Sequence, residues 1–278
     1  MASDASRGAA AAGGAGAGFV LLLLWINSYP FIDKEVLVHS WVGDPQWFLV
    51  LCGAWGLCFV GGLMGNEWLV IGISGVTCGG KTTLANRLVR ALTPAYVFHQ
   101  DQYFFPDDSP HHVRCEGLPV QHNNYDILSA LDMKAMYSDV LATMAGEDRS
   151  HGKSLERENK LEVRGKKILI AEGFTVLNYK PFMELCDLRY YFILEYGECA
   201  VRRALRVYSP PDVPDYFDKC VWPEHLRYRA EMERDPRVNM IEGTRPDTLE
   251  LAGIWHSIGD MFGMQRDLVE NANDKIPN

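Results

Sequence analysis

The sequence lacks the cysteine and histidine spacings that form zinc sites. Its seven cysteines stand at positions 52, 58, 78, 115, 186, 199 and 220, and no two of them make a CxxC pair. A structural zinc site needs four suitably spaced ligands, so the pattern excludes the zinc-finger classes. Because the number is odd and the spacing irregular, we expect reduced thiols in a cytoplasmic protein and not a disulfide framework.

Basic residues are too few for a typical nucleic-acid-binding protein. The 278 residues include 27 Lys and Arg against 36 Asp and Glu, which gives a net charge of −9. A protein that binds nucleic acid needs a clustered basic surface, so we expect no nucleic-acid partner. With 47% hydrophobic and 23% charged residues, the chain has the composition of a folded globular protein. None of this predicts an oligomeric state.

Charged residues are also missing from one segment near the N-terminus. Residues 1–18 are rich in Ala, Gly and Ser and predict disorder, whereas residues 47–65 are 19 consecutive uncharged residues, about enough to cross a bilayer. The segment is rich in glycine, and a predicted strand follows almost at once. We therefore expect an N-terminal extension over residues 1–65, with Met64 as a possible natural start, and keep a membrane anchor at 47–65 as the alternative.

Residues 66–278 contain apolar runs that alternate with amphipathic stretches. Continuous runs of branched residues are typical of strands buried on both faces, and alternating strands and helices predict a parallel sheet. The expected strands are 68–73, 96–98, 167–171, 189–194 and 238–241, and the expected helices are 81–92, 126–145, 198–207, 221–233 and 248–268. The prediction is one α/β domain whose five-stranded parallel sheet has helices on both faces, with residues 146–165 as a solvated connection.

Residues 75–82 read GVTCGGKT and match the phosphate-binding pattern GxxxxGK[ST] in full. Glycines let backbone N–H groups approach phosphate oxygens, and the following helix points its positive end at the same phosphates. Lys81 can bridge the β- and γ-phosphates, and the hydroxyl of Thr82 can ligate Mg²⁺. The motif lies between a predicted buried strand and a predicted helix, as it requires. It therefore indicates a P-loop fold that binds ATP.

Two carboxylates follow predicted strands at the edge where open α/β sheets bind ligands. Asp101 follows the second strand and Glu172 ends the third. An aspartate there can accept a proton from a substrate hydroxyl or hold Mg²⁺ through water, although it can also be an ordinary turn residue. GTPases would carry a DxxG motif followed by NKxD, and this pair does not appear. The pattern favours a kinase of small molecules.

Beyond the P-loop, a series of short motifs resembles the nicotinamide riboside kinase family. In chain order, between about residues 67 and 270, they include Gln100-Asp101, Tyr125-Asp126, Glu172-Gly173-Phe174, Arg206-Val207-Tyr208, Pro210-Pro211-Asp212, Tyr216-Phe217-Asp218 and Gly243-Thr244. The resemblance implies transfer of a phosphoryl group from ATP, with Mg²⁺, to the 5′-hydroxyl of nicotinamide riboside and of nicotinic acid riboside. It also implies a small lid at about residues 200–218.

The same resemblance implies a role for each site residue. Asp101 is the general base, while Lys81, Arg202 and Arg206 offset the charge of the transferred phosphoryl group. The expected magnesium-side residues are Thr82, Asp101 and Glu172. The expected nucleotide contacts are Gly75, Val76, Thr77, Cys78, Gly79, Gly80, Lys81, Thr82, Thr83, Arg202, Arg206, Val207, Tyr208, Arg245, Pro246 and Asp247. The expected substrate contacts are Asp101, Gln102, Tyr103, Phe104, Tyr125, Asp126, Arg203, Tyr208 and Ser209.

Several of these roles have a plain structural alternative. The resemblance places the cationic nicotinamide ring between Tyr125 and Tyr208, where stacking and cation–π attraction both apply, yet both tyrosines could equally be core residues. The resemblance implies that Asp126 accepts hydrogen bonds from the ribose hydroxyls, yet an aspartate before a predicted helix can equally be the N-cap of that helix. Gln102 stands where the family often has a second acid. Residues 107–124 form a longer stretch than expected, which could be a substrate-side flap.

Two further interpretations of the whole chain stay open. The first is another nucleoside kinase, such as a uridine kinase, which a panel of nucleosides would distinguish. The second is a membrane-tethered adaptor with a vestigial nucleotide site, which would need residues 47–65 to insert into a bilayer. The complete set of Lys81, Thr82, Asp101 and Glu172 argues against a vestigial site.

Overall fold

The computed structural model describes residues 67–153, 160–163, 165–244, 253–254 and 256–257, all of which belong to the unit Gly62–Asn278. The predicted extension and its apolar segment 47–65 lie outside the described residues, as does most of the predicted helix 248–268. Among the residues that are described, we find no helix with the length and apolar character needed to cross a membrane.

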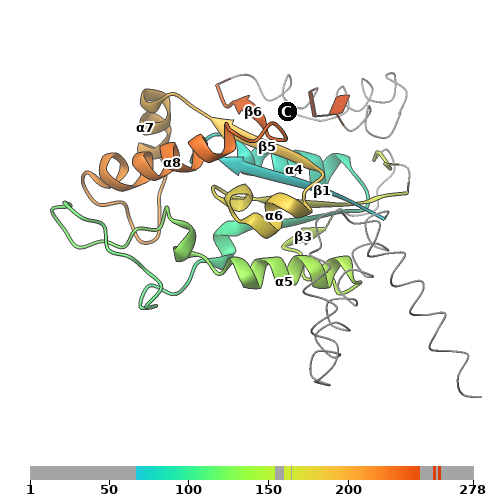
Figure 1. Cartoon of the computed structure of the whole chain (residues 1–278), viewed down its shortest axis with the longest axis horizontal. Helices are drawn as coiled ribbons and strands as arrows, with labels where there is room; N and C mark the ends of the chain where they lie inside the picture. The colour runs from blue at the N-terminus through green and yellow to red at the C-terminus, as the bar shows by residue number, and fades with distance from the viewer. Residues whose placement is uncertain (1–66, 154–159, 164, 245–252, 255, 258–278) are drawn as a thin grey trace, which may run out of the picture. The chain divides into compact units, whose positions relative to one another are not determined.

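The core is a sheet of parallel strands with one short antiparallel addition (Figure 1). The strands are β1 (Trp68–Gly75), β2 (Ala95–His99), β3 (Gly152–Lys153), β4 (Lys167–Glu172), β5 (Leu188–Ile193) and β6 (Asn239–Glu242). Their order is β3-β2-β4-β1-β5-β6, and β3 pairs antiparallel with β2 at one edge. The predicted five-stranded parallel sheet is confirmed. The connection 146–165 differs from the prediction because it adds the sixth strand.

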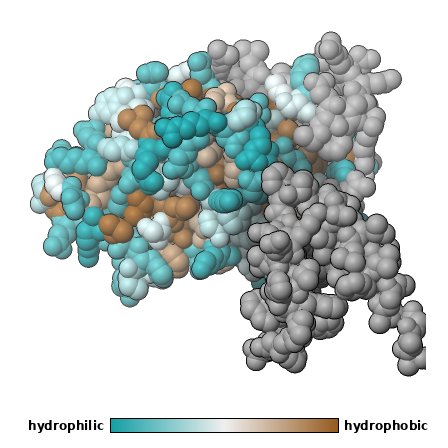
Figure 2. Space-filling view, in the orientation of Figure 1, coloured by the Kyte–Doolittle hydropathy of each residue, from teal (hydrophilic) through white to brown (hydrophobic). Residues whose placement is uncertain are grey.

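Helices cover both faces of this sheet, and Figure 2 shows hydrophilic residues over much of one face of the domain, with hydrophobic residues among them. The helices are α4 (Lys81–Ala91), α5 (Met133–Met144), α6 (Lys180–Leu185), α7 (Tyr196–Ala204) and α8 (Trp222–Met232). Shorter helical segments are the 3₁₀ helices η2 (Gln100–Tyr103), η3 (Leu128–Ala130) and η4 (Val176–Asn178) and the π-helix η5 (Phe217–Val221), which leads directly into α8. Alternate residues of β1 enter two cores: Leu69 and Ile71 pack with Leu88 of α4, and Val70 packs with Met136 of α5. This double burial explains why β1 is a continuous apolar run.

The helix predicted at 126–145 begins later in the structure. The carboxylate of Asp132 accepts a hydrogen bond of 2.9 Å from Ala135 N and caps α5, so that residues 128–130 form a separate turn. Asp126 is therefore not the N-cap of this helix, and its side chain is available for other contacts. The helix predicted at 198–207 is also shorter, because α7 ends at Ala204.

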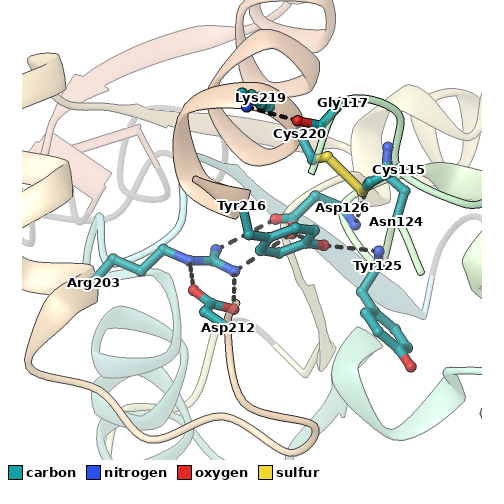
Figure 3. Close-up of a disulfide and its surroundings, with 10 residues drawn as sticks. All are labelled: Cys115, Gly117, Asn124, Tyr125, Asp126, Arg203, Asp212, Tyr216, Lys219 and Cys220. Atoms are coloured by element: carbon teal, nitrogen blue, oxygen red, sulfur yellow. Dashed lines mark hydrogen bonds and ion pairs between the residues drawn. A yellow bond between two sulfur atoms is a disulfide. The ribbon is translucent and has the colours of Figure 1, made fainter. Parts of the chain in front are cut away.

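The expectation of reduced thiols is wrong for one pair of cysteines. A disulfide joins Cys115 and Cys220, which are 105 residues apart in the sequence (Figure 3). Cys78, Cys186 and Cys199 are free and buried. The irregular spacing concealed the pair, because the two residues meet only when the segment 107–124 packs against η5.

Candidate active site

In Figure 1 the arrow of β1 points toward the side of the domain that holds α7 and α8, and the P-loop begins at the end of that strand. Gly75 has a φ of +116°, and a Cβ added to it would lie 2.2 Å from the carbonyl oxygen of Phe192. Only glycine fits this turn without strain. Val76 N donates to the same carbonyl oxygen at 2.9 Å, which ties the loop to β5.

Lys81 is buried at the start of α4, where its Nζ donates to the carbonyl oxygen of Val76 at 2.7 Å. Burial lowers the pKa of Lys81, and the nearby carboxylates of Glu172 and Asp101 oppose this shift. The P-loop, Asp101 and Glu172, which we call the phosphate end, therefore form one electrostatic group at the carboxyl edge of the sheet.

The hydroxyl of Thr82 lies 3.2 Å from both carboxylate oxygens of Glu172. On its other side, Glu172 Oε1 lies 2.6 Å from Nδ1 of His99, and this hydrogen bond raises the pKa of His99. Hydroxyl and carboxylate oxygens are the donors that Mg²⁺ prefers, and the ion usually takes its other ligands from phosphates and water. In the described part of the chain, no group of three or more acidic, His or Cys side chains could enclose a metal. The Thr82 hydroxyl and the Glu172 carboxylate are nevertheless oxygen donors of the kind that fits a magnesium ion.

Asp101 lies on η2, directly after β2. The preceding residue, Gln100, is fully buried and exchanges two hydrogen bonds of 3.0 Å with Thr175, in the loop that follows Glu172. A Cβ on Gly173 would lie 2.2 Å from the Cβ of Gln100, so this close packing requires glycine. Although Asp101 is exposed, partial desolvation and then the charge of Glu172 raise its pKa.

A second group of side chains, which we call the nucleoside end, consists of Tyr125, Asp126, Arg203, Asp212 and Tyr216 (Figure 3). The buried Arg203, from α7, donates to Asp212 at 2.7 and 3.1 Å and lies 3.5 Å from each oxygen of Asp126. Burial alone would lower the pKa of Arg203, but the two aspartates raise it. Burial raises the pKa of Asp126, against the influence of Arg203 and Tyr216.

The two tyrosines predicted to hold the ring lie on different parts of the site. Tyr125 donates to Asp107 at 3.0 Å, and its ring centroid is 5.1 Å from that of His112. Tyr208 has its hydroxyl 3.4 Å from Thr77 in the P-loop, and its ring centroid is 4.5 Å from the guanidinium carbon of Arg203. Tyr208 therefore links the phosphate end to the nucleoside end. The ring sandwich itself stays a prediction.

The remaining predicted residues differ in their surroundings: one contacts the P-loop, several are exposed, and three are not described. Arg202 donates to the carbonyl oxygens of Cys78 and Gly243 at 3.2 and 3.0 Å, so it braces the P-loop backbone. Arg206 is exposed, yet its charge contributes to the lowered pKa of Lys81. Thr83, Gln102, Val207 and Ser209 are exposed. Arg245, Pro246 and Asp247 lie outside the described residues.

Tyr103 and Phe104 point to different neighbours. The hydroxyl of Tyr103 donates to Asp139 of α5 at 3.1 Å. The ring of Phe104 lies 6.0 Å from that of Tyr125, at the nucleoside end. Phe104 is thus near the other candidate substrate residues, and Tyr103 is tied to a helix.

Sequence reasoning assigned no role to several residues that shape the site. His99 and Gln100 hold the two carboxylate segments, and Asp212 and Tyr216 complete the nucleoside end. Asp212 and Tyr216 occur in motifs that carried the family resemblance, which was the available signal. The contacts of Asp212 and Tyr216 depend on the tertiary structure, so the motifs alone did not reveal what these two residues do.

The parallel sheet, the P-loop after β1, Asp101 after β2 and Glu172 at the end of β4 define a P-loop kinase. No protein-family model matches the chain. It is 42% identical over 168 residues to nicotinamide riboside kinase 2 of Homo sapiens, which covers 59% of this chain and 69% of that protein. It is 39% identical over 203 residues to nicotinamide riboside kinase 1 of Rattus norvegicus, and this match covers 72% of this chain and 98% of that protein. The chain belongs to the nicotinamide riboside kinase family.

Among solved structures, the chain is similar to a possible uridine kinase from Bacillus stearothermophilus. The TM-score is 0.38 and the sequence identity is 18%, over 64% of this chain and 96% of that one.

Proposed function

We propose that this chain transfers the γ-phosphoryl group of ATP to the 5′-hydroxyl of nicotinamide riboside and forms nicotinamide mononucleotide, a step of NAD salvage. The observation that carries the proposal is the joint placement of Lys81, the Thr82–Glu172 pair and Asp101 at one edge of the sheet. Family membership supports nicotinamide riboside as the substrate, because the relatives are named nicotinamide riboside kinases. Nicotinic acid riboside is a second expected substrate.

The residues of the phosphate end divide the chemistry among them. Asp101 accepts the proton of the 5′-hydroxyl as that oxygen attacks the γ-phosphorus. Lys81 offsets the phosphate charge, and Arg206 does so from the lid. Thr82 and Glu172 would hold Mg²⁺, which neutralises phosphate charge when it is bound. Most of the catalysis is then positioning and electrostatic stabilisation, as is usual for phosphoryl transfer.

The nucleoside end supplies the recognition. Asp126 and Arg203 face each other from segments far apart in the chain and offer an acceptor and a donor to the ribose hydroxyls. Asp107, hydrogen-bonded to Tyr125, adds a carboxyl group beside the predicted ring site, which suits a cationic base. These features support a pyridinium nucleoside over a neutral one.

The test is product formation by the full chain from nicotinamide riboside, ATP and Mg²⁺, followed by mass spectrometry. We expect nicotinamide mononucleotide and ADP in equal amounts, with nicotinic acid riboside also accepted and uridine turned over more slowly. A clear preference for uridine would overturn the proposed substrate. No ADP formation with any nucleoside would overturn the kinase assignment.

The boundary between residues 65 and 66, the small lid at about 200–218 and a cytoplasmic location also belong to the proposal. The alternative is anchoring through residues 47–65. Fractionation of cells that express the full chain, beside cells that express residues 64–278, tests the location. Recovery of the full chain in membranes and of the shorter chain outside them would favour the anchor.

A further inference from the structure

Tyr216 is a buried residue between α7 and η5, and its side chain has only 1% of its surface exposed. Its hydroxyl donates to Oδ2 of Asp126 at 2.9 Å and accepts a hydrogen bond from the backbone N of Tyr125 at 2.9 Å (Figure 3). A single hydroxyl therefore contacts two consecutive residues of the nucleoside end.

This hydroxyl makes the shortest contact of the Asp126 carboxylate among the described residues. The nitrogens of Arg203 lie 3.5 Å from that carboxylate, at the limit of a hydrogen bond, and bind Asp212 more closely at 2.7 and 3.1 Å. Arg203 is thus shared between the two aspartates and bound more closely by Asp212. A carboxylate has about four acceptor positions, so Asp126 can hold the Tyr216 hydroxyl and still accept hydrogen bonds from a ligand.

Tyr216 is itself held firmly. Its ring packs edge-on against that of His122, with centroids 4.7 Å apart and an angle of 80° between the planes. Just after it in the chain, Lys219 donates to the carbonyl oxygen of Gly117 at 2.6 Å, and Cys220 forms the disulfide with Cys115 (Figure 3). The segment that carries the hydroxyl is therefore fastened to the 107–124 stretch.

We propose that Tyr216 is a positioning residue, which orients the carboxylate of Asp126 and the backbone of Tyr125 for the ribose of the substrate. The inference rests on the proposed function only in requiring that the substrate is a ribonucleoside. Tyr216 acts through Asp126 and does not itself touch the reacting atoms.

The first test replaces Tyr216→Phe, which keeps the ring and removes the hydroxyl. The control is Tyr228→Phe in α8, because the buried Tyr228 hydroxyl likewise accepts a backbone hydrogen bond, from Leu128 N at 2.8 Å, and contacts no residue of the nucleoside end. We expect Tyr216→Phe to raise KM for nicotinamide riboside about tenfold, on the scale of one hydrogen bond to a charged group, with KM for ATP unchanged. Tyr228→Phe should change neither constant.

The second test uses nicotinamide riboside and its 2′-deoxy and 3′-deoxy analogues with the same variants. If Tyr216 orients Asp126 toward a ribose hydroxyl, the preference for the ribonucleoside over one of the deoxy analogues should fall in Tyr216→Phe and persist in Tyr228→Phe. Thermal unfolding of both variants measures how much each substitution reduces the stability of the fold. Equal effects of the two variants on KM and on this preference would overturn the inference, since a structural role alone would then explain them.

The two proposals fail in distinguishable ways. If the wild-type chain phosphorylates uridine and not nicotinamide riboside, the proposed substrate fails, and the same comparison is made with uridine and its deoxy analogues. The ribose hydroxyls are the same, so a reduced preference in Tyr216→Phe still supports the inference. If Tyr216→Phe keeps the preference for the ribonucleoside over its deoxy analogues, the inference is wrong even where nicotinamide riboside is the substrate.

Discussion

The phosphate end and the nucleoside end are held in place by different means. The P-loop is a run of eight residues that backbone hydrogen bonds tie to the sheet, such as Val76 N to the carbonyl oxygen of Phe192. The nucleoside end depends on side chains that are far apart in the sequence, since Asp126 lies 77 residues from Arg203 and 90 from Tyr216. The first is mainly a product of the local chain, and the second of tertiary packing.

This difference predicts that the two ends can be damaged separately. Substitutions at the phosphate end should reduce turnover or ATP binding with little loss of stability. Substitutions at the nucleoside end should reduce stability and nucleoside binding together, because buried charges there depend on each other.

The largest effect should come from Asp101→Asn. The variant removes the proposed base at nearly constant size, so we expect turnover to fall by roughly 10²- to 10⁴-fold while ATP still binds. Turnover is measured as nucleotide product, and ATP binding by calorimetry. Asp108→Asn, at an exposed aspartate in the 107–124 stretch, is the control and should keep full activity. Undiminished turnover in Asp101→Asn would contradict its assignment as base.

Arg203→Met tests the nucleoside end. It leaves Asp126 and Asp212 without their shared cation, and we expect a loss of about 2–3 kcal/mol in the free energy of unfolding, reduced from the value for a fully buried pair because Asp212 is 28% exposed. ATP should still bind. Urea unfolding gives the stability, and calorimetry gives ATP binding.

Two variants sharpen this test. The exposed Arg227 pairs with Glu224 on the surface of α8, and Arg227→Met should cost less than about 1 kcal/mol. Adding Asp212→Asn to Arg203→Met should recover part of the loss, because it removes one of the unpaired charges. If Arg203→Met is as stable as Arg227→Met, buried charge pairing does not hold the nucleoside end together.

Gly243→Ala asks how closely the P-loop depends on a neighbouring strand end. A Cβ at this position, just after β6, would lie 2.4 Å from the carbonyl oxygen of Gly79. Because that oxygen belongs to the backbone, the loop must shift, and we expect KM for ATP to rise about tenfold. Gly197→Ala is the control, since a Cβ there meets nothing within 4 Å. Equal KM values for ATP in the two variants would show that the loop tolerates the displacement.

The same contrast explains how much of the structure could be predicted. The five parallel strands and the P-loop were predicted correctly, because burial on both faces and the glycine pattern are local signals. The start of α5 was predicted wrongly, because Asp126 and Asp132 are equally suitable N-cap residues and tertiary contacts decide between them.

Other features of the site could not be predicted for a related reason. The packing of Gln100 against Gly173 and the pairing of Cys115 with Cys220 join residues that are distant in sequence. No periodicity or short motif reports such contacts. The roles expected of Arg202 and Asp126 came from the family resemblance, and the structure adds their hydrogen-bond partners.

The smallest expected effect concerns α8, which packs against β1, η4 and η5. His225 of α8 is buried and stacks with Tyr191 of β5, and burial, followed by the charges of Lys81 and Arg229, lowers its pKa to about 3. The folded chain therefore keeps His225 neutral at pH 6, whereas the unfolded chain binds a proton near pH 6.5. Since the unfolded state takes up more protons as the pH falls, this histidine makes the folded state less stable at lower pH.

Between pH 7.5 and pH 6, the uptake of this proton should cost on the order of 1 kcal/mol of unfolding free energy. His225→Phe keeps an aromatic ring on Tyr191 and cannot titrate, so its stability should fall by that much less over the same interval. Urea unfolding at both pH values measures the difference, and His111→Gln, at an exposed position, should behave as the wild type does. If His225→Phe loses as much stability as the wild type, the buried histidine of α8 is not the source of the pH dependence.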